Sequence, residues 1–460
     1  MAGLPRALSP LRSGSYRLLA GSLALSLFGQ GMWAIALVWQ VLALGAGPAV
    51  LGLVTGASAA GMLASTLLGG ALADRVPQRR ILLGVELLQT AAAGAVAVLS
   101  LAGVLTTWHL GLASLLTGIG MGLYYPAYSA LVPALVPAEQ LLAANGLEGV
   151  VRPLLAQAAG PAVAGVVVAA SSPGIALAAT AAAALLAGVA VHALPDTPVR
   201  REIGEGGPGT GLLADVREGF VYMVRTPWLL ATLLFAAAML LVFIGPFQVL
   251  VPYVVAEVGG GPAQHAWVLA AFGIGGAAGS LAVASLRLPR RYLTVMNVLW
   301  GAGCLPMVVF GASPALWVMV AAGALMGATF QAGMVIWGTL LQRRVPPELL
   351  GRVSSLDFFT SLSFMPLSMA LAGTVSETIG TTATFLVAGL APPVMAVVAV
   401  VAARLPADEL AHPLDTAPAA PLPEPVPPTG AAAPAPAGAA WMDRGAGTSP
   451  VQEGEISWPN

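Results

Sequence analysis

Twelve apolar segments follow one another along this chain, and they constrain its fold more than any other feature. Each is about 20 to 28 residues long, and a helix of that length crosses a hydrocarbon layer about 30 Å thick. Hydrophobic residues make up 58% of the chain and charged residues only 8%, far from the balance of a water-soluble domain. The sequence therefore predicts an all-α, multi-pass membrane protein.

The bounds of the predicted spans follow from the apolar runs and the polar or Gly/Pro-rich connections between them. We expect twelve transmembrane helices at residues 17–43, 49–73, 80–104, 107–132, 141–170, 173–194, 228–255, 265–287, 292–311, 315–342, 352–375 and 381–404.

The basic residues are distributed to one side of this pattern. All 19 are arginine, and 18 of them lie in the N-terminal segment, the even-numbered loops or the C-terminal tail. Loops that face the cytoplasm carry the excess of basic residues in membrane proteins. Both termini are therefore predicted to be cytoplasmic, in a bacterial inner membrane. The lipid bilayer is the expected surrounding.

The chain also repeats itself. The motif at 135–139 recurs at 344–348, at an offset of 209 residues, and the pair Arg79–Arg80 recurs as Arg290–Arg291, at an offset of 211. Parallel repeats of six helices occur in secondary transporters, whose substrate site lies between the repeats. The sequence thus predicts two pseudo-symmetric six-helix bundles.

The expected organisation has five parts. These are a cytoplasmic N-terminus at 1–16, an N-terminal bundle at 17–194, a linker with an amphipathic helix at 195–227, a C-terminal bundle at 228–404 and a disordered cytoplasmic tail rich in Pro and Ala at 405–460.

One loop carries a recognisable motif. Between the second and third spans, Gly70 is followed by Asp74, Arg75 and the pair Arg79–Arg80. This spacing resembles the cytoplasmic loop signature of the major facilitator superfamily, although Pro77 stands where that signature has a second glycine. An acid at a helix end can bind the N-terminus of a neighbouring helix, and the arginines can hold that corner by charge-assisted bonds. The loop is expected to act as a latch in gating, or only to fix the topology.

A second motif lies in the fifth predicted span, where Gly160, Pro161 and Gly165 occur within six residues. It resembles the Gly-Pro signature that exporters of the superfamily carry in this helix. Small residues let helices approach closely, and Pro161 removes a helical hydrogen bond. Ordinary helix packing is the alternative interpretation.

Ionisable residues inside predicted spans are costly and so indicate function. Glu148 and Arg152 lie four residues apart in the fifth span, Glu86 lies in the third and Asp357 in the eleventh. Asp357 is at the repeat offset of 209 from Glu148. A carboxylate removed from water binds a proton more readily, so these residues are candidates for proton coupling. Structural ion pairs are the alternative.

Polar amides and aromatic residues of the spans are candidates for lining a substrate cavity. They are Gln30, Trp33, Gln248, Gln331 and Trp337. Such side chains would suit a bulky, mostly apolar organic molecule.

Several classes of function are not supported. His109, His192, His265 and His412 do not have metal-ligand spacing, so no metal site is predicted. No phosphate-binding loop or group of catalytic residues occurs, so we expect no enzyme activity and no cofactor. No nucleic-acid partner is expected either.

The resemblance covers residues 15–405 and is closest to the branch that includes macrolide efflux pumps and the enterobactin exporter. It implies a secondary exporter of a hydrophobic or amphipathic small molecule, such as a drug, siderophore or metabolite. Transport by alternating access and proton antiport is expected. A monomer is expected to be functional, because one twelve-helix unit holds a complete pathway. The alternatives are uptake, an uncoupled facilitator, or a non-transporting sensor or scaffold.

Overall fold

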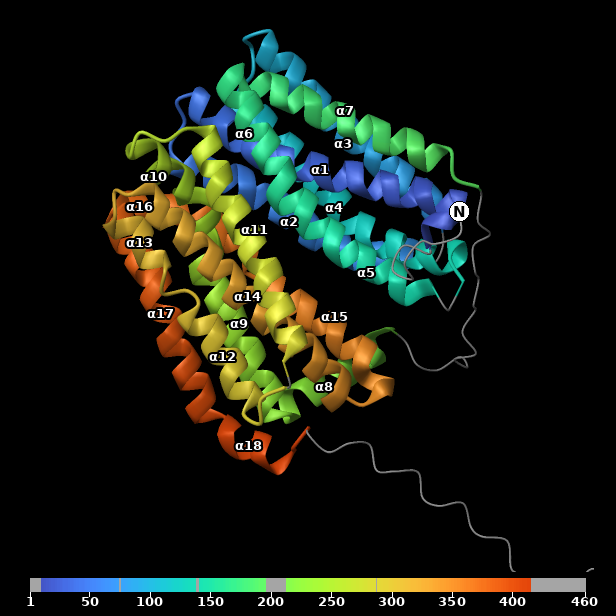
Figure 1. Ribbon diagram of the computed structural model, residues 1–460, viewed down its shortest axis with the longest axis vertical. Helices are drawn as coiled ribbons and strands as arrows, with labels where there is room; N and C mark the ends of the chain where they lie inside the picture. Colours follow the sequence, from blue (N-terminus) through green and yellow to red (C-terminus); the bar gives the residue numbers. More distant parts are fainter. Residues whose placement is uncertain (1–9, 74–75, 138–139, 196–211, 287, 415–460) are drawn as a thin grey trace, which may run out of the picture. The chain divides into compact units, whose positions relative to one another are not determined.

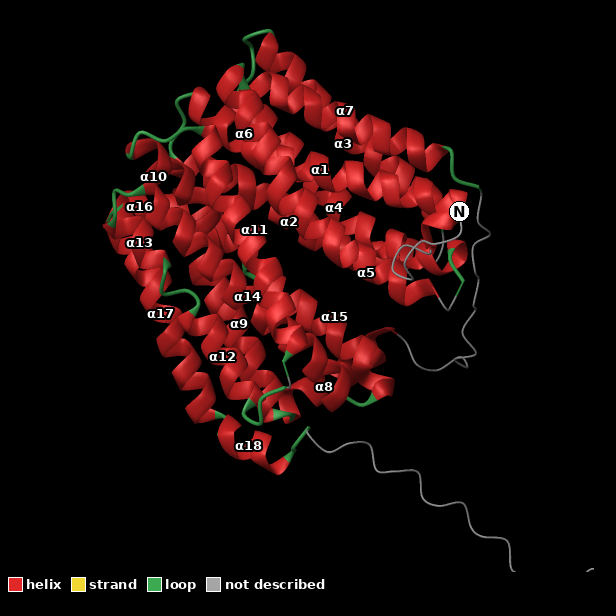
Figure 2. Cartoon of the chain, in the orientation of Figure 1, coloured by secondary structure: helices red, strands yellow, loops and turns green. Residues whose placement is uncertain are grey.

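Helices supply all the regular structure in the part of the chain that the computed structural model describes, which is residues 10–73, 76–137, 140–195, 212–286 and 288–414 (Figures 1 and 2). Twelve helical segments within it are long and apolar enough to cross a membrane. The predicted fold class is confirmed, and the observed segments overlap the twelve predicted spans one by one.

The first six spans form the N-terminal half of the molecule. Its helices are α1 (Gly14–Ala43), α2 (Pro48–Ala73), α3 (Gln78–Leu101), α4 (Thr107–Leu135), α5 (Leu141–Arg152), the π-helical segment η3 (Pro153–Ala159), α6 (Gly160–Ala170) and α7 (Pro173–His192).

The C-terminal half begins after a connecting helix, α8 (Leu212–Arg225). Its helices are α9 (Pro227–Gly245), the π-helical segment η4 (Pro246–Leu250), α10 (Val251–Glu257), α11 (Pro262–Ser285), α12 (Tyr292–Ala302), α13 (Met307–Ala312), α14 (Leu316–Arg344), α15 (Pro347–Ser363), α16 (Met365–Ile379), α17 (Thr381–Ala402) and α18 (Leu405–Ala411).

Prolines mark the places where spans change their helical geometry. Pro153 opens η3 in the fifth span and Pro246 opens η4 in the seventh, because proline has no N–H to continue the α-helical ladder. The eleventh span is interrupted at Phe364, between α15 and α16. Since 364 − 153 = 211, this interruption falls at the repeat offset from Pro153. The fifth and eleventh spans thus depart from regular α-helix at corresponding positions.

The linker helix α8 packs on α9 and α15. Met223 is buried, whereas Phe220 keeps 52% of its surface exposed. Glu218 forms an ion pair with Arg352 of α15. A helix is therefore present where the amphipathic helix was predicted, while residues 196–211 of the linker lie outside the described residues.

The first residues of the predicted disordered tail need a correction, because Leu405–Ala411 form helix α18. Leu405 and Glu409 are buried, at 0% and 1% exposure. The Glu409 carboxylate accepts hydrogen bonds from the backbone N–H groups of Leu293 and Thr294 at 2.9 and 3.1 Å, so it caps the start of α12. Residues 415–460 lie outside the described residues.

The halves contact each other most extensively through α2 with α16 and through α6 with α11. Gly373 of α16 lies against Pro48 and Ala49 of α2. The Tyr253 hydroxyl donates a hydrogen bond to the carbonyl oxygen of Ala46 at 2.9 Å. These contacts lie near the ends of the spans whose loops hold no arginine, which we call the Arg-free ends.

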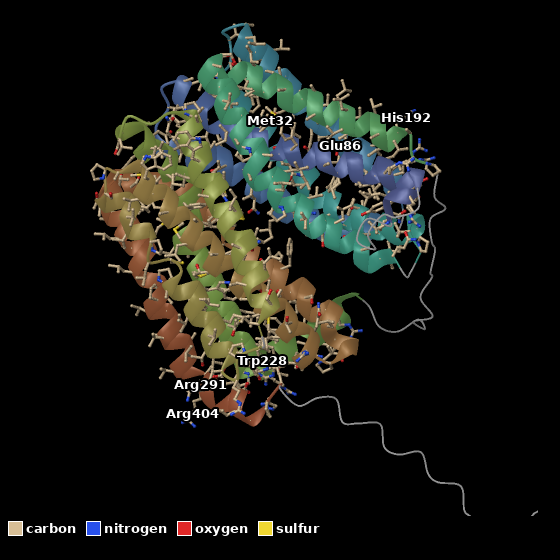
Figure 3. The ribbon with its side chains drawn as sticks, in the orientation of Figure 1. Met32, Glu86, His192, Trp228, Arg291 and Arg404 are labelled. Atoms are coloured by element: carbon tan, nitrogen blue, oxygen red, sulfur yellow. The ribbon has the colours of Figure 1, made fainter. Side chains whose placement is uncertain are left out.

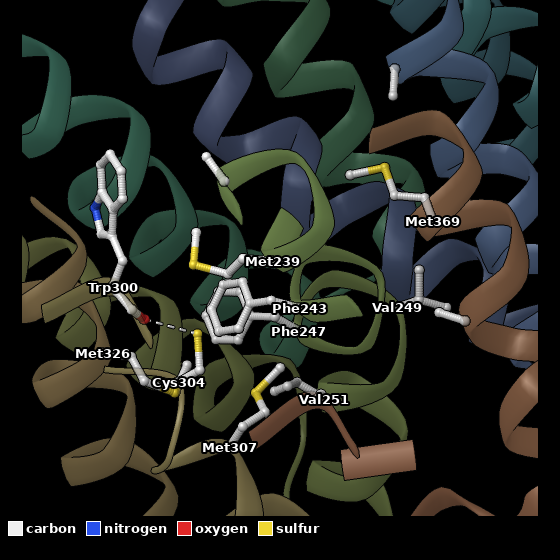
Figure 4. Close-up of a cluster of buried hydrophobic side chains, with 14 of the residues drawn as sticks. Met239, Phe243, Phe247, Val249, Val251, Trp300, Cys304, Met307, Met326 and Met369 are labelled. Carbon is white, nitrogen blue, oxygen red and sulfur yellow. Dashed lines mark hydrogen bonds between the residues drawn. The ribbon is translucent and has the colours of Figure 1, made fainter. Parts of the chain in front are cut away.

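Buried Met, Phe and Trp side chains fill the interior of the C-terminal half (Figure 4). In this cluster the Cys304 thiol contacts the carbonyl oxygen of Trp300 at 3.2 Å. Cys304 is 4% exposed, so it behaves as a small apolar core residue. The cluster continues toward α9 and η4, where Phe243 and Phe247 reach the edge of the cavity described next.

Candidate functional site

A cavity of about 440 Å³ lies between helices of the two halves, and we call it the central cavity. Its walls come from α1, α2, α3, α4, η3, α6 and α7 on one side and from α9, η4, α11, α14 and α16 on the other. Most of its lining is apolar. The polar side chains in its lining are Gln30, Thr55, Ser58, Gln89, Thr117, Gln157, Thr180, Gln248 and His265.

Four phenylalanines form an aromatic wall on the C-terminal side of the central cavity, and all four line it. The ring centroids are 5.7 Å apart for Phe243 and Phe247, 5.1 Å for Phe247 and Phe272, and 6.5 Å for Phe272 and Phe330. Those separations are within the range of favourable ring contacts. Trp33 lines the cavity from α1. The cavity can thus hold a flat or bulky apolar group between aromatic surfaces.

The structure brings three of the five predicted cavity residues together. Gln30, Trp33 and Gln248 line the central cavity. Gln331 and Trp337 are not among its described lining residues. Gln331 packs against Gly276 of α11, so it fills a contact between helices.

Trp337 instead contacts a predicted coupling residue. It is 5% exposed, and its indole N–H donates a hydrogen bond to Oδ2 of Asp357 at 3.0 Å. Ser361 donates a second one to Oδ1 at 3.4 Å. Trp228 and Trp300 lie beside Trp337, with ring centroids 6.2 and 6.3 Å away. Asp357 is therefore tied to the interior of the C-terminal half.

Glu148 and Arg152 form an ion pair within the fifth span. Arg152 Nη2 lies 2.6 Å from Glu148 Oε1, as expected for residues one helical turn apart. The guanidinium carbon is 5.3 Å from the ring centroid of Tyr125, so a cation–π contact adds to the ion pair. Both residues line a second cavity of about 490 Å³, together with Tyr125, Tyr128 and Ser129. This ion-pair cavity is separate from the central cavity in its lining residues.

Glu86 lies inside the N-terminal half (Figure 3) and is 0% exposed. Neither carboxylate oxygen has a hydrogen-bond partner among the described residues. The hydroxyl groups of Ser26 and Tyr124 lie nearby but outside hydrogen-bonding geometry. Glu86 is not among the described lining residues of either cavity.

The Gly-Pro motif of the fifth span lies where three helices meet. Gly160 packs against the Phe28 carbonyl and Gly31 of α1. Gly165 packs against Pro262 and Ala266 of α11, in the other half. Pro161 lines the central cavity. The motif thus joins the cavity wall to a contact between the halves.

The predicted gating loop is described only in part. Asp74 and Arg75 lie outside the described residues. Gly70 belongs to helix α2, but its surroundings are not described. Arg79 donates hydrogen bonds to the carbonyl oxygens of Val191 and His192, at 3.4 and 2.5 Å. The Arg79 guanidinium therefore provides hydrogen-bond donors for backbone carbonyl groups at the C-terminal end of α7. Arg80 is exposed.

Sequence reasoning missed seven polar residues of the central cavity, namely Thr55, Ser58, Gln89, Thr117, Gln157, Thr180 and His265. Each is a polar residue in an apolar span, and that signal alone could have identified them. His265 was set aside because it lacks metal-ligand spacing. The described residues contain no group of His, Cys, Asp and Glu that could hold a metal ion.

Comparison with known proteins identifies the family of the chain. Residues 6–429 match the model of the family described as transmembrane secretion effectors. Macrolide efflux protein A of Streptococcus pyogenes is 24% identical over 324 residues, which cover 70% of this chain and 79% of that protein. The multidrug efflux pump Tap of Mycolicibacterium fortuitum is 28% identical over 390 residues, covering 82% and 93%.

Solved structures show the same fold at low sequence identity. The nucleoside transporter NupG has a TM-score of 0.68 at 13% identity, covering 84% of this chain and 98% of its own. A D-xylose-proton symporter has a TM-score of 0.66 at 15% identity, covering 83% and 96%. The resemblance predicted from the loop and helix motifs is confirmed, and none of these relatives is an enzyme. The chain belongs to the transmembrane secretion effector family and is a multi-pass transporter of the major facilitator superfamily.

Proposed function

We propose that this protein exports a hydrophobic or amphipathic small organic molecule by alternating access, driven by inward proton flow. The central cavity carries the proposal, because it combines an aromatic wall with scattered amides at the boundary of the two halves. Secondary transporters bind their substrates at such a boundary. The relatives that are efflux pumps support export over uptake.

The arginine pattern gives the proposed orientation. If the arginine-bearing ends face the cytoplasm of a bacterial inner membrane, the Arg-free ends face outward. Contacts between Gly373 and Pro48, and between Tyr253 and Ala46, then close the outer side. The conformation would be one that loads substrate from the cytoplasm, and opening those contacts would release it.

Glu148 is the carboxylate that we propose for coupling, with Asp357 and Glu86 as the alternatives. Its pairing with Arg152 supports this, because protonation of Glu148 would release the arginine and change the charge of the ion-pair cavity. Asp357 is held by Trp337 and Ser361, and Glu86 is sealed from both cavities in the described part. Unlike Glu148, neither of these carboxylates is among the described lining residues of a cavity from which it could take up a proton.

Purified protein reconstituted in liposomes tests the proposal. A lipophilic dye and a macrolide would be offered under an imposed proton gradient of either direction, with protein-free liposomes as the control. Movement that follows the gradient supports proton-driven export. Movement that is equal with and without the gradient would leave an uncoupled facilitator, and movement of neither compound would contradict the proposed substrate class.

A further inference from the structure

The central cavity differs from the rest of the transmembrane region in its charge. Its described lining contains no Asp, Glu, Lys or Arg side chain. The ionisable residues of the nearby spans lie outside this lining. Glu148 and Arg152 pair with each other in the ion-pair cavity, Asp357 is hydrogen-bonded to Trp337, and Glu86 is buried inside the N-terminal half. A ligand in the central cavity therefore meets amides, hydroxyls, one imidazole and apolar surface.

Two of the polar groups there lack a partner. Gln89 of α3 is 8% exposed and its side-chain Nε2 has no hydrogen-bond partner among the described residues. His265 of α11 is 2% exposed and its Nδ1 has none either. Buried polar groups are normally satisfied. Both residues line the cavity, from opposite halves, but these two nitrogen atoms are themselves buried, so a ligand reaches them only after the side chains rotate. They fit a ligand that brings its own hydrogen-bonding groups.

We propose that the cavity selects an electrically neutral, amphipathic molecule that carries carbonyl or hydroxyl oxygens. Once the Gln89 side chain rotates toward the cavity, its amide N–H can donate to a carbonyl or hydroxyl oxygen of the ligand. A ligand hydroxyl can likewise pair with the His265 imidazole in either tautomer. The apolar face of the ligand would lie on Phe247 and Phe272. This inference rests on the proposed function, since it assigns the class of cargo that the exporter takes.

The alternative is a lipophilic cation held on the aromatic rings. The rings of Trp33 and the phenylalanines do attract cations, but a full charge taken out of water needs a counter-charge to offset its lost hydration. The described lining supplies none. An anion meets the same difficulty, because the cavity has no arginine. Neutral ligands are therefore favoured.

Equilibrium binding of two related dyes tests this inference. Nile red and Nile blue share a fused aromatic skeleton, but Nile red is neutral with a carbonyl oxygen and Nile blue is a cation at neutral pH. We expect protein in lipid nanodiscs to bind Nile red at least about 10-fold more tightly than Nile blue. Equal affinities, tighter binding of Nile blue, or binding of neither dye would overturn the inference.

Charge variants then locate the selectivity. Gln89→Glu places a carboxylate in the lining and should lower the Nile red to Nile blue preference by about 10-fold or more. Gln157→Glu, at a half-buried position of the same cavity, tests the same point if the first variant does not fold. Gln342→Glu is the matched control, because Gln342 is exposed at the end of α14. An equal effect of the control would also overturn the inference.

Transport separates this inference from the proposed function. If Nile red binds preferentially but does not move in liposomes under a proton gradient, proton-driven export fails while the neutral cavity stands. If both dyes move with the gradient at equal rates and bind equally, export stands while the charge selectivity fails.

Discussion

The indole N–H of Trp337 and the carboxylate of Asp357 are joined by a hydrogen bond of 3.0 Å between α14 and α15. The two residues were predicted to have different roles, one in the cavity and one in proton coupling. Their contact makes Trp337 a positioning residue for Asp357. It also holds the ring beside Trp228 and Trp300, outside the described lining of the central cavity.

Trp337→Phe should therefore destabilise the protein by leaving Oδ2 of Asp357 without its donor. The expected loss in free energy of unfolding is about 1–2 kcal/mol, because Asp357 is half-buried and water can partly replace the lost donor. Asp357→Asn should cost less, because its amide oxygen can still accept from the indole. Unfolding of the single and double variants in mixed micelles measures the coupling energy, and additive effects would contradict a direct interaction.

Glu148→Gln tests the proposed coupling. The substitution keeps the size of the side chain but removes the charge that pairs with Arg152. We expect uphill, gradient-driven efflux from liposomes to be lost, while exchange of labelled for unlabelled substrate without a gradient continues. That split distinguishes loss of coupling from loss of the binding site.

Glu257→Gln is the matched control for that experiment, because Glu257 is an exposed carboxylate at the end of α10. It should pump like the natural protein. If Glu148→Gln retained full gradient-driven efflux, the coupling carboxylate would have to be sought at Asp357 or Glu86 instead.

The spans were predictable because length and hydrophobicity decide whether a helix crosses a membrane, and the arginines mark its ends. Which residues face the cavity was much less predictable. Apolar residues surround α1 and α14 on every side, so no amphipathic pattern shows which face turns inward. Trp33 and Trp337 looked equivalent in the sequence, yet only Trp33 lines the cavity.

Helix α18 could not be predicted from the composition of its segment. Leu405–Ala411 directly precedes a long run rich in proline and alanine, and the whole segment was predicted to be disordered. Its order depends on contacts with distant residues: Glu409 caps α12, and Asp408 lies 2.5 Å from Arg344 at the end of α14. Figure 3 shows Arg404, Arg291 and Trp228 near this region. Local composition carries no information about such partners.

These contacts predict where the chain can be shortened. Deletion of residues 415–460 should leave transport and stability unchanged, because every described contact of α18 remains. Deletion from Leu405 onward removes the Glu409 cap and the Asp408–Arg344 ion pair, and it should lower the thermal unfolding midpoint and the yield of folded protein. Normal stability of the longer deletion would show that α18 is dispensable.

A point substitution isolates the cap itself. Glu409→Ala should cost about 1–2 kcal/mol, the upper part of the range for loss of an N-cap side chain, because two backbone N–H groups and the Thr294 hydroxyl lose their acceptor. Leu410→Ala, at a side chain that is 60% exposed on the same helix, is the matched control and should have little effect. Thermal unfolding in detergent compares the two.

Gly165→Ala tests the contact between the halves at the Gly-Pro motif. A β-carbon at this position would lie 2.8 Å from the Ala266 side chain and 2.9 Å from the Pro262 carbonyl oxygen, closer than atoms normally pack. The helices α6 and α11 must separate to relieve this overlap, at a cost of about 1–3 kcal/mol. The variant should therefore favour conformations in which the Arg-free ends are apart.

Spin labels on cysteines introduced at Leu44 and Ile379, in a Cys304→Ser background, measure that separation. Both positions are exposed near the Arg-free ends and belong to different halves. We expect longer label distances in Gly165→Ala and slower transport, because the return to the closed state is opposed. Gly84→Ala is the control, since Gly84 is exposed on α3 and a β-carbon there meets no described atom within 4 Å. Unchanged distances in Gly165→Ala would mean that α6 and α11 can absorb a methyl group without opening, and that the glycine is not required for closing the Arg-free ends.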